Sequence, residues 1–309
     1  MTRSMLIGIA AALLAALAWS TNFVVPYVIG DYSIFDFAVF RFVISGAIGF
    51  GFLAFKWDLV RLLTLRDWLT AFWLGFIGYV GYFLTVVGAA IFAGPVVAPA
   101  CLGLVPVVLA IAGNLRQPVL QWRGLVLPLA LTAIGLTLVN ISVFEPAGLQ
   151  TSSSLLVGIP LAIAAVILWT WFGLANQTAL AERPGMHGAV WTALIMAGGG
   201  LEMLAFIPVG QMIGVFEIPR LGLSWNAAAP LYLWGVSLAI FASVGGALAW
   251  TLAAKRLPMT LCAQLIVSET VFGTVFGLAA HGRLPTLTGG LVAAIGAFKR
   301  DKATGCDAI

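Results

Sequence analysis

Charged residues are scarce in this sequence. They make up only 8% of the 309 residues, whereas 62% of the residues are hydrophobic. A soluble domain carries roughly 25% charged residues. No soluble core could bury this much apolar surface, so the composition indicates an integral membrane protein. The net charge of +4 does not indicate nucleic-acid binding, because the charges cluster between apolar segments as membrane topology requires.

Residues that perform catalysis or bind metals are equally sparse. The two histidines, His187 and His281, fall in loops predicted to lie on opposite faces of the membrane. The cysteines, Cys101, Cys262 and Cys306, are dispersed and form no CxxC pair. The sequence has no HExxH, no acid–His–nucleophile cluster and no P-loop. We therefore expect no enzyme, no metal site, no cofactor and no direct use of ATP.

Long apolar segments are abundant, and they predict an all-α integral membrane protein of ten spans. The spans cover about 4–29, 34–55, 67–91, 95–114, 123–142, 154–178, 187–208, 229–253, 258–280 and 285–299. Tight hairpins at 92–94 and 255–257 are expected to join spans 3 and 4 and spans 8 and 9. Each hairpin is followed at once by a proline, which suits the first turn of a new helix.

The positive charges indicate the orientation. With both termini in the cytoplasm, twelve of the fifteen Lys and Arg residues fall in inner segments, two fall in outer loops and Arg41 falls inside a span. This asymmetry favours ten spans with both termini in the cytoplasm. The first apolar run continues to Ile29, longer than the core of a signal peptide, so we expect a span there.

The spans divide into two sets of five, residues 1–150 and 151–309. A shift of 164 residues places Gly277 on Gly113. Separately, and not under this shift, Trp19 of span 1 corresponds to Trp169 of span 6, since each lies in a run rich in Ala and Leu. An odd number of spans inverts the second repeat relative to the first. Inverted repeats build many transporters, whose substrate site lies near the midplane where the repeats meet.

Several motifs now resemble a known family. They are WSTNFV at 19–24, Arg41-Phe42, the segment ending at Leu104-Val-Pro106, and SETVFG at 268–273. Together they resemble the drug/metabolite transporter superfamily with two EamA-type repeats. The last motif, with Tyr79 and Tyr82, is most similar to YddG-type aromatic amino acid exporters. Many relatives carry a Glu where this chain has Arg283. The resemblance implies efflux of amino acids or related metabolites.

Glu269 is the most conspicuous polar residue, because an ionisable group in mid-span marks a functional site by default. Gln264 and Ser268 lie beside it, and Gly273 and Gly277 follow on the same helical stripe, where small residues let a neighbouring helix approach. We interpret Glu269 as a substrate-facing acid or a proton site. The alternative is a buried structural acid bonded to Ser, Asn or Arg.

Aromatic and polar residues of other spans are candidates to line a cavity with Glu269. They are Tyr79, Tyr82, Trp19, Asn22, Trp169 and Trp250. Mid-span tyrosine needs a partner for its hydroxyl, which a hydrated cavity supplies, and central tryptophans can stack aromatic substrates. The alternative for each is simple packing in an apolar bundle.

Two further pairs are candidates for structural or gating roles. Arg41 and Glu202 lie in equivalent spans and could pair with each other, or Arg41 could pair with Asp36; Arg41 holding a substrate carboxylate is the less favoured interpretation. Pro99 and Pro106 should break the hydrogen-bond ladder of span 4, as a bendable gate or as a static kink.

The sequence thus predicts a secondary transporter that works by alternating access. The resemblance implies that it exports aromatic and other neutral amino acids or related metabolites across the bacterial inner membrane. Its partners would be the small-molecule substrate and the lipid bilayer, with the chain acting as a monomer. Efflux of drugs or cationic compounds, with Glu269 as the cation's partner, is the alternative within transport. A non-transporting partner or sensor subunit is the alternative from another class.

Overall fold

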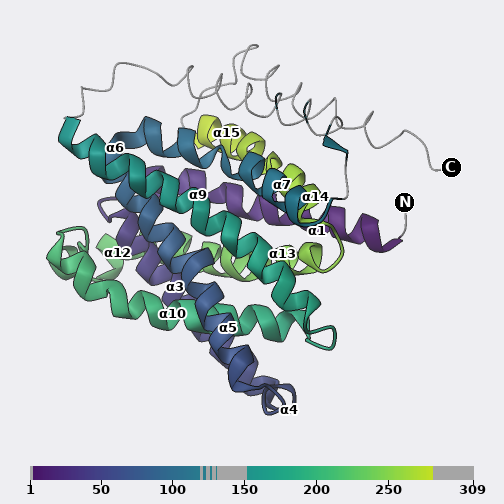
Figure 1. Ribbon diagram of the computed structural model, residues 1–309. Helices are drawn as coiled ribbons and strands as arrows, with labels where there is room; N and C mark the ends of the chain where they lie inside the picture. Colours follow the sequence, from purple (N-terminus) through teal and green to yellow (C-terminus); the bar gives the residue numbers. More distant parts are fainter. Residues whose placement is uncertain (1–2, 119–120, 123–125, 127–129, 131–151, 281–309) are drawn as a thin grey trace.

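The computed structural model describes residues 3–118, 121–122, 126, 130 and 152–280. The elements in this part are all helices, packed side by side as a bundle (Figure 1). In chain order they are α1 (Arg3–Ser20), η1 (Thr21–Val24), α2 (Val25–Val28), α3 (Ile34–Phe55), α4 (Trp57–Val60), α5 (Leu65–Gly75), η2 (Phe76–Val80), α6 (Gly81–Leu102), α7 (Val105–Arg116), α9 (Ser152–Ala181), α10 (Gly188–Met212), α11 (Ile218–Leu221), α12 (Trp225–Leu238), η3 (Ala239–Gly245), α13 (Gly246–Ala254), α14 (Met259–Ile266) and α15 (Ser268–Ala280).

Six helical segments are long and apolar enough to cross a membrane. They are Arg3–Val28, Ile34–Phe55, Leu65–Ala93, Ser154–Ala181, Gly188–Met212 and Trp225–Ala254, and they match predicted spans 1, 2, 3, 6, 7 and 8. Two shorter apolar helices, Val105–Arg116 and Met259–Gly273, lie in predicted spans 4 and 9. Predicted spans 5 and 10 lie outside the described residues.

One end of the bundle gathers loops predicted to be external. The carboxylate of Asp36 accepts from the backbone N–H groups of Glu217 and Ile218, at 2.9 and 3.2 Å, and completes a capping box with Ser33 at the start of α3. The hydroxyl of Tyr32 donates to the carbonyl of Gly222 at 2.6 Å, and burial raises the pKa of this tyrosine. The loop before α12 is therefore bound to the start of α3.

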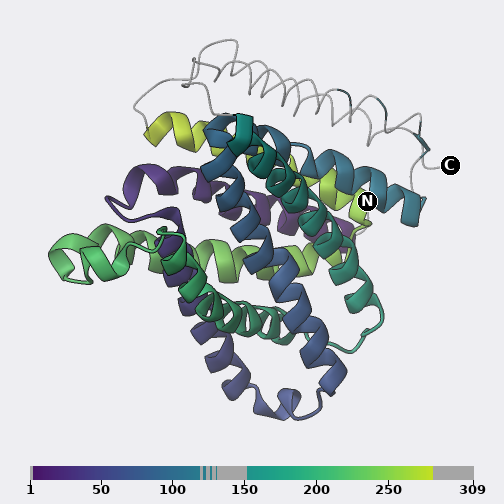
Figure 2. The same cartoon turned by 60° about the vertical axis from the view of Figure 1, so that its left-hand side comes forward.

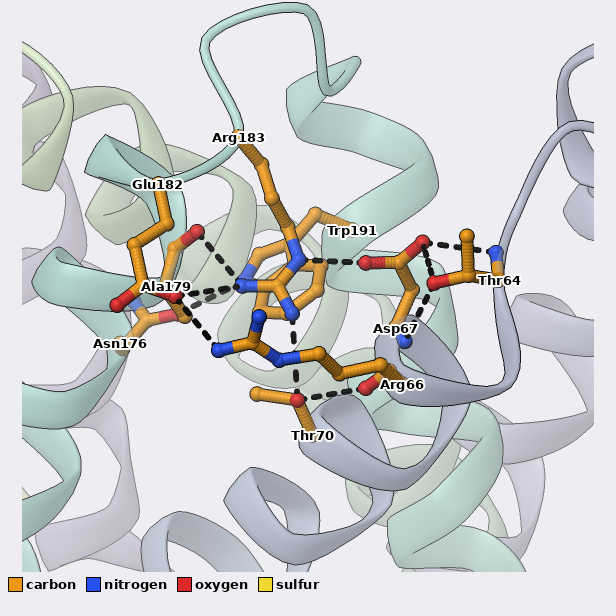
Figure 3. Close-up of polar contacts among 9 residues, drawn as sticks. All are labelled: Thr64, Arg66, Asp67, Thr70, Asn176, Ala179, Glu182, Arg183 and Trp191. Atoms are coloured by element: carbon orange, nitrogen blue, oxygen red, sulfur yellow. Dashed lines mark hydrogen bonds and ion pairs between the residues drawn. The ribbon is translucent and has the colours of Figure 1, made fainter.

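The opposite end gathers loops predicted to be cytoplasmic, as two views of the bundle show (Figures 1 and 2). Arg183, in the turn after α9, donates to the carboxylate of Asp67 at 2.5 Å and covers the ring of Trp191 (Figure 3). Lys255, after α13, donates to the carbonyl of Met186. The inner turns are thus joined by charged side chains, whereas the outer loops are joined mainly through backbone groups.

Close backbone approach organises the middle of the bundle. An added Cβ on Gly46 of α3 would lie 2.8 Å from the Cα of Gly200 on α10, and one on Gly200 would lie 2.9 Å from the Cα of Gly46. Gly49 approaches the carbonyl of Ala193 in the same way, at 2.8 Å. Small residues at these positions let two helix backbones meet, as is typical of helix pairs in membranes.

The hairpin predicted at 92–94 is wrong. The helix runs without a break from Gly81 to Leu102, through the position of Pro99, and the chain turns at 103–104 before α7. A single glycine does not end a helix in an apolar segment, and neighbouring helices allow proline inside one. Pro106 lies in the first turn of α7, where its missing N–H costs no hydrogen bond.

The hairpin predicted at 255–257 is confirmed, since α13 ends at Ala254 and α14 begins at Met259. Predicted span 9 is not a single helix, however. It consists of α14 and α15, which are separated at Val267, directly before Ser268 and Glu269. Glu269 therefore lies in the first turn of α15 rather than in the middle of a helix.

Irregular helix segments occur at matching places in the two halves. The 164-residue shift places Phe76–Val80, the π-helical η2, on Ile240–Val244, which lies within the π-helical η3. The same shift places the turn at 103–104 on Val267 and Ser268, the junction between α14 and α15. The agreement of these irregular positions favours an internal repeat, although the same shift places the turn at 255–257 on residues 91–93, inside α6.

Candidate functional site

Three tryptophans form an aromatic cluster in the middle of the bundle. The ring centroid of Trp19, from α1, lies 5.2 Å from that of Trp169 on α9 and 5.6 Å from that of Trp250 on α13. Tyr82, at the start of α6, packs on Trp169 at 5.0 Å. Four of the residues predicted to share a site therefore do so, contributed by both halves of the chain.

A second arm of aromatic rings extends this cluster toward α3. Phe172 lies 5.2 Å from Trp169 and 5.8 Å from Tyr79, and Tyr79 lies 6.2 Å from Phe42. Sequence analysis predicted Tyr79 but missed the two phenylalanines, because nothing distinguishes them from ordinary core residues. Rings at these separations favour edge-to-face or offset contacts, so they form a continuous aromatic surface.

Arg41 lies at the α3 end of this surface, and its pairing was predicted wrongly. Its guanidinium donates to the hydroxyl of Ser243 at 2.6 Å and to the side-chain carbonyl of Asn22. Neither Glu202 nor Asp36 contacts it, and within the described part of the chain Arg41 forms no ion pair. Only 6% of Arg41 is exposed, so its positive charge is buried among neutral partners.

Sequence analysis missed Ser243, although the repeat contains a signal for it. The 164-residue shift places Ser243 on Tyr79, so the two residues occupy equivalent positions of η3 and η2. Tyr79 interacts electrostatically with Arg41, which means that both π-helical segments contribute a hydroxyl-bearing residue near the same cation. Asn22 comes from η1, a third irregular segment.

Glu269 lies at the Tyr82 side of the cluster. It is half-buried, and it is close enough to Tyr82 for the two groups to interact electrostatically. Among residues 3–118 and 152–280, its carboxylate forms no hydrogen bond or ion pair, so no Ser, Asn or Arg there supplies the structural partner considered above. The aromatic surface therefore separates a buried cation, Arg41, from a carboxylate.

The remaining predicted residues of α14 and α15 are less closely tied to the cluster. Ser268 donates to the carbonyl of Leu265 in the preceding helix, α14, at 2.6 Å, and Gln264 is half-buried. Gly273 lies against the ring of Phe23, since an added Cβ would be 2.4 Å from its Cδ2 atom, so its close neighbour is a side chain rather than the helix backbone that was expected. Gly277 continues α15.

Comparisons with known proteins agree with a membrane location. The chain is 29% identical over 291 residues to the inner membrane protein YtfF of Escherichia coli (strain K12), covering 92% of this chain and 90% of that protein. A solved crystal structure, described only as that of a protein, matches with a TM-score of 0.71 and 19% identity over 98% of this chain and 96% of the other. No family model matches. The chain is a multi-pass inner membrane protein.

The arrangement presents groups that can bind a ligand. In the described ranges no group of three or more His, Cys, Asp or Glu residues could hold a metal ion. The site presents a buried guanidinium with donors directed at neutral atoms, an aromatic surface and a carboxylate that has no partner among the described residues. Buried charges retained in a membrane protein mark ligand or ion sites.

Proposed function

We propose that this chain is a secondary transporter of the drug/metabolite transporter type that exports neutral amino acids, aromatic ones above all, or related small metabolites. One observation carries the proposal. An aromatic surface separates the buried, ion-pair-free Arg41 from Glu269 within the described part of the protein. The two charges and the rings between them match the three parts of an aromatic amino acid.

The chemistry of each part can be stated. A guanidinium binds a carboxylate through two parallel hydrogen bonds, and Arg41 would exchange its neutral partners, Asn22 and Ser243, for this stronger interaction. Glu269 would receive the substrate's ammonium group. The indole and phenol rings would stack on the substrate's side chain.

The backbone supports alternating access around such a site. Asn22, Tyr79, Ser243 and Glu269 lie in or directly beside irregular helix segments. Transporters place substrate groups at interrupted helices near the midplane, where one repeat rocks against the other. The drug or cationic-compound alternative uses Glu269 and the rings but gives Arg41 no role.

Uptake into proteoliposomes tests the proposal. The purified protein would be loaded with unlabelled tryptophan, and exchange with labelled tryptophan would be measured against competition by tryptamine, which lacks the carboxylate, and indole-3-propionate, which lacks the amine. We expect tryptophan to compete best. Preference for tryptamine would support cation efflux instead, and exchange no faster than in empty vesicles for a broad amino acid panel would support a non-transporting role.

Variants of Arg41 and Glu269 test which residue binds each end of the substrate. Arg41→Lys and Arg41→Met should weaken tryptophan binding, the latter roughly 30-fold or more, because removing one partner of a buried hydrogen-bonded charge pair costs about 2–5 kcal/mol. The same changes should leave tryptamine binding unaltered. Glu269→Gln should weaken binding of tryptophan and of tryptamine, and leave binding of indole-3-propionate unaltered. Arg220→Met, an exposed arginine at the outer end, is the matched control. Equal losses for both ligands in Arg41→Met would contradict the assignment.

A further inference from the structure

Glu202 is a buried acid that the proposed substrate site does not use. It lies in the membrane-spanning α10, and only 6% of it is exposed. Both of its carboxylate oxygens are buried without a hydrogen-bond partner among the residues that the structure describes. Transferring an unpaired carboxylate from water into an apolar interior costs so much that such a group neutralises instead. The geometry is therefore that of a carboxylic acid rather than a carboxylate.

The neighbours of Glu202 place it against a part of the backbone that departs from α-helical geometry. A Cβ added to Gly75, the residue before the π-helical η2, would lie 3.5 Å from one carboxylate oxygen. Gly199, three residues earlier on α10, faces Tyr79 and Val80 of the same segment. π-helical turns occur frequently at functional sites and are less regular than the α-helices around them. Glu202 thus lies at the contact between α10 and η2.

No charge in the described part of the chain offsets the burial of Glu202. The elements packed against α10 are α3, α5, η2, η3 and α13, and their titratable or charged residues are Asp36, Arg41, Arg66, Asp67 and Tyr79. Arg41 is bonded to Asn22 and Ser243, and Asp36 to the outer loop. Arg66 and Asp67 lie at the inner end, where they are bonded to Glu182 and Arg183. Apart from Glu202, α10 carries no titratable residue.

We propose that Glu202 is a proton-binding site, protonated in this conformation, which releases its proton to water when the contact between α10 and η2 opens. The O–H bond of the acid breaks, the carboxylate remains on α10, and the proton leaves to the side that has become accessible. Because η2 also carries Tyr79 beside the substrate site, release of the proton and movement of the site would occur together. The transport part of this inference rests on the proposed function; the protonation part does not.

Infrared spectroscopy tests the protonation directly, without a substrate. Protein reconstituted in lipid at neutral pH should show the carbonyl stretch of a protonated carboxylic acid, and Glu202→Gln should remove that band. Glu202→Asp, which retains a titratable group, should shift the band instead. Glu269→Gln is measured in parallel, because Glu269 is a second half-buried intramembrane acid without a partner among the described residues, and any band of its own is thereby assigned separately. A spectrum left unchanged by Glu202→Gln would overturn the proposal.

Transport measurements test the coupling. A pH gradient should drive accumulation of the exchanged amino acid by the wild type, and Glu202→Gln should reduce that accumulation to its level without a gradient while retaining substrate exchange. Retained exchange also shows that the variant folds. Gradient-driven accumulation that persists in Glu202→Gln would overturn the coupling. If no amino acid is exchanged by the wild type, the proposed function fails, and the infrared result still decides whether Glu202 holds a proton.

Discussion

The two π-helical segments occupy equivalent places in the two halves but carry different chemistry. In η2, Tyr79 packs edge-on against Phe172, and Gly78 admits the same ring so closely that an added Cβ would lie 2.2 Å from it. In η3, Ser243 accepts from Arg41 and the carbonyl of Ala242 accepts from the indole of Trp19 at 3.0 Å. One segment contributes aromatic surface and the other contributes polar contacts.

Under the proposed function, this difference lets two similar backbone segments serve an asymmetric ligand. The π-helical geometry of η2 recurs in η3, at positions 164 residues further along the chain. The side chains at these matched positions differ. Strict symmetry would surround a substrate with two identical surfaces. An amino acid has a charged polar end and an apolar end, so a site with two unlike halves suits it better. Substitutions at matched positions of η2 and η3 should therefore have unlike effects.

The largest effect is expected at Gly78. Valine there would place its Cβ inside the van der Waals radius of Phe172, and relief requires the ring or the helix to move. Overpacking of this kind costs about 1–3 kcal/mol. We expect Gly78→Val to lower the melting temperature in detergent by several degrees and to weaken the contact between η2 and α9.

Two further variants test whether the clash with Phe172 causes this loss of stability. Phe172→Ala combined with Gly78→Val should recover part of the lost stability, because the clash is with that ring. Gly51→Val on α3 is the control, since nothing lies within 4 Å of an added Cβ there. Equal destabilisation by Gly51→Val would show that the loss arises from removing glycine rather than from the close packing of η2.

The sequence was sufficient for the class of protein and for six of its spans because composition and apolar length are averages over many residues. The π-helical segments could not be predicted, since one extra residue in a turn hardly alters an apolar pattern. The partner of Arg41 was missed as well, although the 164-residue shift places Ser243 on Tyr79. Pairing it with Glu202 followed from charge alone, whereas the fold brings Ser243 to it from a segment 202 residues away.

An intermediate effect is expected from removing the hydroxyls at the matched positions. Ser243→Ala deletes the acceptor for the Nε–H of Arg41 and leaves a buried charged donor unpaired, at a cost of about 1–3 kcal/mol. Tyr79→Phe should cost less, because in the described part of the chain its hydroxyl makes no hydrogen bond. Chemical denaturation in detergent compares the two. A larger loss for Tyr79→Phe would reverse the roles assigned to η2 and η3.

The smallest effect is expected from the two matched tryptophans. Trp19→Phe and Trp169→Phe remove the same ring, but only Trp19 donates its indole N–H to a buried carbonyl, that of Ala242 in η3. No hydrogen bond from the indole of Trp169 occurs within the described ranges, and its ring instead packs on Tyr82 beside η2. Trp19→Phe should therefore be less stable than Trp169→Phe by about 1 kcal/mol, the usual net value of one hydrogen bond.

Tryptophan binding should show the opposite order, with Trp169→Phe the weaker binder, because the half-buried ring is the one available to stack on a ligand. Equal stability and equal binding in the two variants would remove the distinction between a polar and an aromatic half.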